Sequence, residues 1–244
     1  MQKNPYGFRA RIGLIYIASA YAMDVEFQEM APRGVTSHVT RIKLSEDPTR
    51  FTIDDLVELE GKALEATSIL SQAPLKAIGF GCTSGSFVNG VQYDKALIQK
   101  MEAIAQVKCT TTSNAVVEAL HQLDVQTIAI AAPYTKEVTD QAIHYFKEAG
   151  FDVANLIGLG MMNDYDISAL DLKTIYDMAV QADHPDAEAV FISCTGIQAL
   201  QVIPLLERDL QKPVLTSNQA TFWHLLRLSG VHENMNQYGK IFDF

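Results

Sequence analysis

Residues 76–86 read K-A-I-G-F-G-C-T-S-G-S, an apolar, β-prone run that loses its side chains at Gly79 and Gly81 and then presents Cys82. A helix-compatible segment follows at residues 91–106. This pattern predicts a buried strand, a tight turn and a thiol at the start of a helix. N–H groups at a helix start favour a thiolate over a thiol and can hold an anion beside it. We therefore predict a reactive cysteine at position 82.

A second stretch of the same kind lies at residues 188–198, E-A-V-F-I-S-C-T-G-I-Q. Again an apolar run ends at a cysteine, Cys194, and an amphipathic segment follows at residues 197–210. Close to half the chain separates Cys82 from Cys194, which indicates equivalent points in two similar halves. We predict that the two thiols face each other across a cleft between those halves.

The composition is that of an ordinary globular protein, with 244 residues, 48% of them hydrophobic and 20% charged. The net charge of −10 argues against a nucleic-acid-binding surface, but a small anionic substrate remains compatible with it. No apolar run is long enough to cross a membrane, and the N-terminus lacks the apolar region of a secretory signal. Three cysteines do not form a disulfide framework, so we expect a cytoplasmic protein.

Strand-like and helix-like segments alternate along the whole chain, which predicts an α/β fold with parallel sheets covered on both faces. The pattern restarts near residue 124, where we expect the second half to begin. Besides the two cysteine strands, strands are expected at 11–17, 35–44, 107–111, 127–131, 151–157 and 213–216, and helices at 24–31, 52–72, 91–106, 114–123, 137–149, 170–182, 197–210 and 218–228.

Ligands of parallel α/β sheets bind beyond the carboxyl ends of the strands. In this chain those ends are rich in thiols, hydroxyls, amides and small residues, and poor in charge. They suit a small anion held by neutral donors, with a thiol on each side. We expect no metal or nucleotide site, because the thiols lack metal-ligand spacing and the glycines match no phosphate loop. Cys109, inside a strand, is expected to be inert core.

Several motifs resemble the aspartate/glutamate racemase superfamily, most of all maleate cis-trans isomerase, with arylmalonate decarboxylase as a more distant relative. The resemblance covers most of the chain after about residue 76. Its motifs are C-T-S-G-S at 82–86, T-T-S-N-A-V-V-E-A-L at 111–120, P-Y-T at 133–135, G-L-G-M-M-N at 158–163, S-C-T at 193–195 and T-S-N-Q-A at 216–220.

The resemblance implies two pseudo-symmetric Rossmann-like domains, each a parallel sheet flanked by helices, with the active site in the cleft between them. The first domain would hold residues 1–123 and 216–244, with the C-terminal strand and helix returning to it, and the second would hold residues 124–215. The resemblance also implies chemistry without a cofactor and a homodimer or higher oligomer.

The resemblance also implies roles for single residues. Cys82 matches the nucleophile of the superfamily, and Cys194 matches its acid/base partner. Residues matching substrate contacts are Ser19, Thr83, Ser84, Tyr134, Asn163, Thr195 and Gly196.

One departure concerns the loop I-A-S-A-Y at residues 17–21. Maleate isomerases carry an asparagine where this chain has Ala20, although Ser19 is retained. Either the substrate differs from maleate, or Tyr21 supplies the missing donor.

Simpler structural interpretations of these residues stay open. Either cysteine can be a small buried core residue, Tyr134 a packing residue, and Asn163 a turn cap.

The leading functional hypothesis is cis-trans isomerisation of a small dicarboxylate such as maleate, which requires one thiolate and one thiol in the resting enzyme. A second hypothesis is a racemase that uses the thiols as two bases. Malonate decarboxylation fits less well, because it needs only one proton donor. A third hypothesis, from a different class, is a ligand-binding or thiol-sensing regulatory protein.

Overall fold

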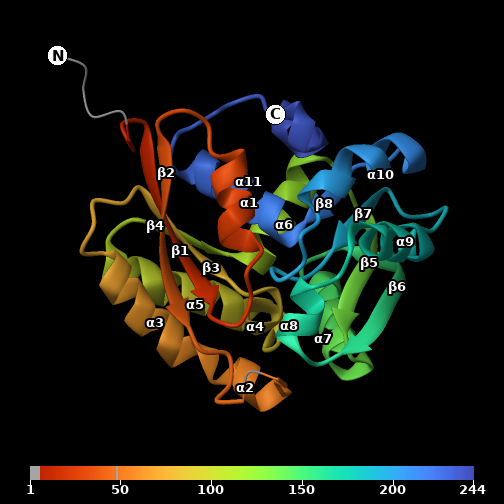
Figure 1. Ribbon diagram of the computed structural model, residues 1–244, viewed down its shortest axis with the longest axis horizontal. Helices are drawn as coiled ribbons and strands as arrows, with labels where there is room; N and C mark the ends of the chain where they lie inside the picture. Colours follow the sequence, from red (N-terminus) through yellow and green to blue (C-terminus); the bar gives the residue numbers. More distant parts are fainter. Residues whose placement is uncertain (1–5, 48) are drawn as a thin grey trace.

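The computed structural model describes residues 6–47 and 49–244. Within these residues the strands form two four-stranded parallel sheets with helices on their faces, side by side in Figure 1. The predicted α/β class is confirmed, and so is the division into two similar halves.

The first sheet has the strand order β2-β1-β3-β4. The buried strands β1 and β3 form its centre, as their nearly continuous apolar sequences lead one to expect. The elements of this half are β1 (Ala10–Ile17), α1 (Met23–Met30), β2 (Val35–Ile42), α2 (Ile53–Val57), α3 (Leu59–Leu70), β3 (Ala77–Gly81), α4 (Thr83–Phe87), α5 (Gly90–Ala105), β4 (Lys108–Thr111) and α6 (Thr112–Gln122).

The second sheet repeats this order as β6-β5-β7-β8. The elements of the second half are β5 (Thr127–Tyr134), α7 (Lys136–Glu148), β6 (Asp152–Met161), α8 (Asp164–Ser168), α9 (Leu172–Ala182), β7 (Ala189–Ile192), the 3₁₀ turn η1 (Leu200–Val202), α10 (Ile203–Leu210) and β8 (Val214–Thr216). The chain then continues with α11 (Ser217–Leu228) and the 3₁₀ turns η2 (Asn236–Tyr238) and η3 (Lys240–Asp243).

The third strand of each half leads to a cysteine. Strand β3 ends immediately before Cys82, and β7 ends two residues before Cys194. Both strands lie inside their sheets, so the two thiols follow topologically equivalent strands. A Cβ at Gly81, the last residue of β3, would lie 2.7 Å from Met23 Sδ and 2.9 Å from Leu14 Cδ1, so a larger residue there would force these side chains to shift.

The C-terminal segment crosses between the halves. Strand β8 pairs in parallel with β7 in the second sheet, whereas the following helix, α11, packs against α6, α1 and β3 of the first half. The expectation that both the strand and the helix return to the first domain is therefore wrong for the strand. The strand β8 remains in the second sheet because its backbone hydrogen-bonds to β7 at the edge of that sheet. Only the helix α11 packs its apolar face against the first half.

Three local expectations also change. The helix expected at 52–72 is two helices, α2 and α3, that meet at Glu58; Thr52 caps the first of them together with Asp55. A short helix, α4, starts directly after Cys82 and precedes α5. The helix expected at 197–210 begins later, at Ile203 after the 3₁₀ turn η1, because residues 195–199 are irregular.

The start of α11 carries a testable stabilising interaction. Thr216 Oγ1 accepts a hydrogen bond from the Gln219 N–H, and the Gln219 side chain accepts one from the Thr216 N–H, both at 3.1 Å. Thr216→Val keeps the side-chain shape but removes the capping hydroxyl, so the free energy of unfolding should fall by about 1–2 kcal/mol. Urea unfolding followed by circular dichroism measures this. Thr216→Ser, which keeps the hydroxyl, should lose less, and equal losses for both variants would contradict a role for the cap.

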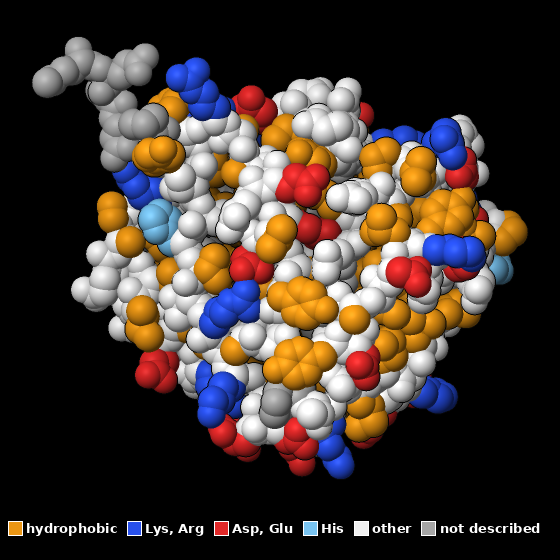
Figure 2. Space-filling model, viewed as in Figure 1, with side chains coloured by type: hydrophobic (Ala, Val, Ile, Leu, Met, Phe, Trp, Pro, Cys, Tyr) orange, Lys and Arg blue, Asp and Glu red, His pale blue; other side chains and the backbone are white. Residues whose placement is uncertain are grey.

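The described helices include none that is both long and apolar enough to span a membrane. On the face of the described chain shown in Figure 2, Lys and Arg side chains stand apart from one another among acidic ones.

Candidate active site

Cys82 and Cys194 line one small cavity between the two sheets, which we call the inner cavity. Its volume is about 20 Å³, space for roughly one water molecule. The inner cavity also brings together the hydroxyl and small residues predicted around the thiols, namely Thr83, Ser84, Tyr134, Thr195 and Gly196. Two thiols and several neutral donors therefore converge from both halves.

Cys82 occupies the N-cap position of α4 with an extended backbone. Its Sγ lies 3.9 Å from Ser84 Oγ, and a Cβ at Gly85 would come within 3.1 Å of it. Burial raises the pKa of the Cys82 thiol to about 12; the Gly85 N–H counteracts this only in part, and the nearby Asp164 carboxylate adds to the rise. The helix start therefore helps the thiolate less than burial disfavours it.

Cys194 has a backbone φ of +117°, a region that residues with a side chain rarely adopt. Its N–H donates to Ser217 Oγ at 3.0 Å, and its Sγ accepts from the Gly196 N–H at 3.3 Å. A strained backbone of this kind persists only where neighbouring contacts hold it, and such positions concentrate at functional sites. Burial raises the pKa of Cys194 to about 12, and Asp164 adds to the rise.

The raised pKa values correct two expectations. A helix start was expected to favour a thiolate at Cys82, but desolvation there outweighs the N–H groups. The resting enzyme was expected to hold one thiolate and one thiol. With both pKa values at about 12, both groups are protonated at neutral pH in this closed cavity.

Thiol alkylation tests this protonation state. Since the thiolate is the nucleophile, the rate at which iodoacetamide modifies Cys82 and Cys194 in the resting protein should rise about tenfold per pH unit between pH 7 and pH 9. Peptide mapping by mass spectrometry resolves the two sites. Glutathione in the same buffers serves as the control, because a thiol with a pKa of about 8.5 levels off in this range. Levelling at either cysteine below pH 9 would contradict the raised pKa.

Tyr134 and Ser217 hold the two cysteine loops together. The buried Tyr134 hydroxyl donates a hydrogen bond to Cys194, and this bond lowers the pKa of the thiol against the larger effect of burial. Ser217 Oγ accepts from Thr83 Oγ1 at 2.8 Å as well as from the Cys194 N–H. The loop after β3 and the loop after β7 thus share one hydroxyl of α11.

Tyr16 performs a similar task from β1. Its buried hydroxyl donates to the Thr195 carbonyl at 2.9 Å and accepts from the N–H groups of Ala22 and Met23, each at 3.1 Å. The Tyr16 ring lies under the Arg41 guanidinium, 5.0 Å from its centroid. This tyrosine fixes the loop after β1 against the Cys194 loop.

Two predicted contact residues, Ser19 and Asn163, lie outside the lining of the inner cavity. Ser19 donates a hydrogen bond of 2.5 Å to Asp164 Oδ2. The Asn163 side chain caps α8 by accepting from the Tyr165 N–H at 2.9 Å, the structural role left open for it. Their substrate contacts remain predictions.

Two residues of the loop after β1, Ala20 and Tyr21, bear on the question of the missing donor. Ala20 lines the inner cavity, whereas Tyr21 is 45% exposed and lies outside it. Tyr21 therefore contributes no donor to the closed inner cavity, and its contact with a substrate stays a prediction.

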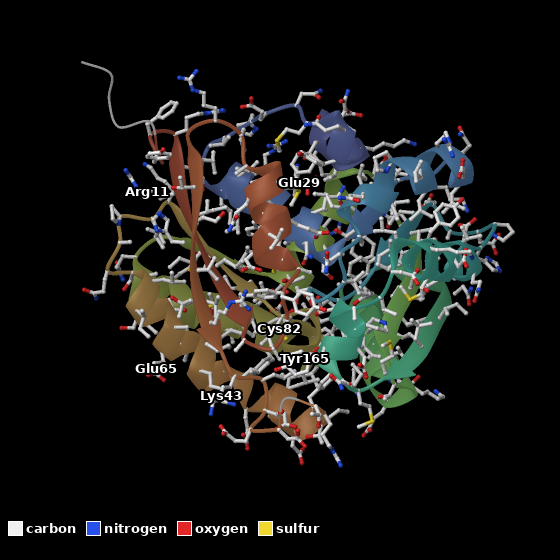
Figure 3. All side chains as sticks on the ribbon, in the orientation of Figure 1. Arg11, Glu29, Lys43, Glu65, Cys82 and Tyr165 are labelled. Carbon is white, nitrogen blue, oxygen red and sulfur yellow. The ribbon has the colours of Figure 1, made fainter. Side chains whose placement is uncertain are left out.

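A second, outer cavity of about 200 Å³ adjoins the inner one. Leu44, Phe51 and Asp164 line both, so these three side chains form the partition between them. The outer cavity is also lined by Ser19, Lys43, Arg50 and Tyr165. In Figure 3, Cys82 and Tyr165 lie at the junction between the two halves. A substrate that enters the inner cavity from the outer one must displace part of this partition.

Comparison with known proteins places this arrangement in a family. A sequence model of the arylmalonate decarboxylase family matches residues 46–242. The chain belongs to this family. It is 32% identical over 164 residues to the arylmalonate decarboxylase of Bordetella bronchiseptica, covering 66% of this chain and 68% of the relative.

The chain is also similar to maleate isomerases. The chain is 25% identical over 232 residues to the maleate isomerase of Pseudomonas putida, covering 89% of this chain and 90% of the relative. A solved structure of the Nocardia farcinica maleate cis-trans isomerase, a cysteine-to-serine mutant with a covalently bound succinylcysteine intermediate, superposes with a TM-score of 0.86 at 18% identity, covering 96% of this chain and 98% of that one. The predicted superfamily and the prediction of an enzyme are confirmed.

In this member of the arylmalonate decarboxylase family, three polar residues that shape the site were not predicted as part of it, in addition to Leu44 and Phe51 of the partition. Asp164 lines both cavities, Tyr16 ties two loops together, and Ser217 bridges the cysteine loops. Ser217 lies at a predicted strand end, and this position could have been used to predict it as part of the site. Tyr16 lies inside a strand, so its position in the sequence did not indicate a role in the site. Across residues 6–47 and 49–244, no group of three or more His, Cys, Asp or Glu side chains is placed to hold a metal ion.

Proposed function

We propose that the chain is a cofactor-independent cis-trans isomerase of a small unsaturated dicarboxylate, maleate or a close analogue. The observation that carries the proposal is the presence of two thiols, one from each half, in the lining of one cavity rich in neutral donors. Its similarity to maleate isomerases along most of the chain supports the reaction type.

The proposed reaction begins with addition of Cys82 as a thiolate to one alkene carbon. The sulfur lone pair forms the C–S bond, and the π electrons move to the other carbon and into its carboxylate. Cys194 then gives its proton to that carbanion, and rotation about the new single bond follows. Return of the proton to Cys194 and expulsion of the Cys82 thiolate give the trans alkene, so atoms and electrons balance.

Ionisation of Cys82 must accompany entry of the substrate. Burial is the main cause of its raised pKa, and the inner cavity has room for about one water. Displacing Leu44 and Phe51 to admit substrate also admits solvent from the outer cavity, which reduces the desolvation of the thiol and lowers its pKa.

Neutral donors on both sides would hold the carboxylates and the charge that develops during addition. Ser84 contributes a hydroxyl beside Cys82, and Thr195 and Gly196 lie beside Cys194. The Tyr134 hydroxyl approaches from β5. We propose these four residues, with Thr83, as the substrate-binding set.

Proton NMR of the enzyme with maleate in D2O tests the function directly. The expected result is conversion to fumarate without any added cofactor. Two thiols across one cavity also suit a two-base racemase, and hydrogen–deuterium exchange at the Cα of an amino acid without alkene isomerisation would favour that reading instead. Release of CO2 from an arylmalonate, with no effect on maleate, would replace the proposal by decarboxylation.

A further inference from the structure

A carboxyl group lies where an isomerase of dicarboxylates would be expected to have none. Asp164, the first residue of α8, lines both the inner and the outer cavity. It is close enough to both thiols to raise the pKa of Cys82 and of Cys194. It therefore faces the same space as the reacting carbons of any substrate held between them.

The surroundings of Asp164 do little to neutralise it. Its recorded partner is the Ser19 hydroxyl, which donates to Oδ2, and among the described residues no Lys, Arg or His forms an ion pair with it. Lys43 of the outer cavity is paired with Glu46 at 2.9 Å, and Arg50 lines that cavity without an ion pair to the described carboxylates. Burial raises the pKa of Asp164, and the Ser19 hydrogen bond offsets this only in part. Beside the ionised form of Asp164, a substrate carboxylate would meet a like charge in a space with little water.

A hydrogen-bond donor in the same place would be favoured. A carboxylate accepts from a carboxamide or an ammonium group, and its unshared oxygen is available because Ser19 uses only Oδ2. An ammonium group on an alkene carbon would lose its proton readily to give an enamine, whereas a carboxamide keeps the carbonyl that accepts electron density during thiol addition. A free carboxyl group of the substrate is ionised at neutral pH.

We infer that Asp164 is a specificity-determining residue, and this inference rests on the proposed function. Asp164 directs the enzyme to the half-amide of an unsaturated four-carbon diacid in preference to the dianion. The carboxamide faces Asp164 and the outer cavity. The single remaining carboxylate is held by the neutral donors around Ser84 and Thr195.

The experiment compares kcat/KM for maleamate, the half-amide of maleate, with kcat/KM for maleate at pH 8, by proton NMR. In the wild type, kcat/KM should be at least about tenfold higher for maleamate than for maleate, because the second carboxylate of maleate would lie beside the like charge of Asp164. Asp164→Asn and Asp164→Ala, which remove the charge, should each shift the ratio toward maleate by about tenfold or more. Asp166→Asn, on the exposed side of the same helix, is the matched control and should leave the ratio unchanged.

A binding measurement separates this inference from the function. Calorimetry with succinamate and succinate, which have no alkene, should show the same preference in the wild type and its loss in both Asp164 variants. Equal or tighter binding of succinate by the wild type, or a ratio that both variants leave unchanged, overturns the inference. If the binding preference follows Asp164 but neither alkene is isomerised, the proposed reaction fails while the selectivity of the site stands.

Discussion

Replacing Cys82 with serine is expected to lower kcat/KM for maleate-to-fumarate conversion by about a thousandfold or more, because an unactivated serine hydroxyl cannot replace a thiolate as the adding nucleophile. The substitution is small and the side chain stays beside Ser84 and Gly85, so the fold should be retained. Initial rates by NMR, with circular dichroism to confirm folding, measure the effect.

Cys109→Ser is the matched control for this substitution. Cys109 is also a buried thiol in the first half, and burial likewise raises its pKa to about 12. It lies in β4, however, with Sγ 3.6 Å from the Val107 carbonyl, and it is absent from the lining of both cavities. We expect this variant to keep near wild-type turnover. Turnover by Cys82→Ser within a few-fold of the control would show that the nucleophile is assigned wrongly.

Replacing Cys194 with serine should stop turnover differently, by trapping an adduct on Cys82. Addition of Cys82 to maleate can still occur, and slow protonation by water would complete a succinyl thioether. Expulsion of the thiolate then needs a base to remove that proton, and serine is a far weaker base than a cysteine thiolate. Intact-protein mass spectrometry should show a mass increase equal to one substrate molecule, mapped by peptide analysis to Cys82.

The control for the trapped adduct is the double variant in which both Cys82 and Cys194 are serine, which should gain no mass. The two roles are exchanged if Cys82→Ser alone accumulates an adduct on Cys194.

The sequence sufficed to predict the fold and the meeting of the two thiols. Local features carried that prediction: apolar strands, the glycines before Cys82, and the repetition of the pattern at Cys194. Parallel strand ends collect on one side of a sheet, so two equivalent ends from two halves share a cleft.

What could not be predicted depends on contacts between distant parts of the chain. The Ser19–Asp164 hydrogen bond joins residues 145 positions apart, and the Tyr16–Thr195 bond joins residues 179 apart. The pKa of the Cys82 thiol was predicted in the wrong direction for the same reason. The N–H groups near Cys82 are visible in the sequence, but the depth of burial that outweighs them is set by packing of the two halves.

The left-handed backbone at Cys194 has a consequence for engineering a more heat-resistant form of this enzyme. Glycine adopts a φ of +117° without strain, whereas alanine does not. The Cys194→Gly variant should therefore be more stable than the Cys194→Ala variant, with a free energy of unfolding about 1 kcal/mol higher. A selection for thermal tolerance alone would therefore tend to replace the residue that the reaction needs. At position 194 the residue that would be most stable in this backbone conformation lacks the thiol that turnover requires, so variant libraries should keep Cys194 unchanged.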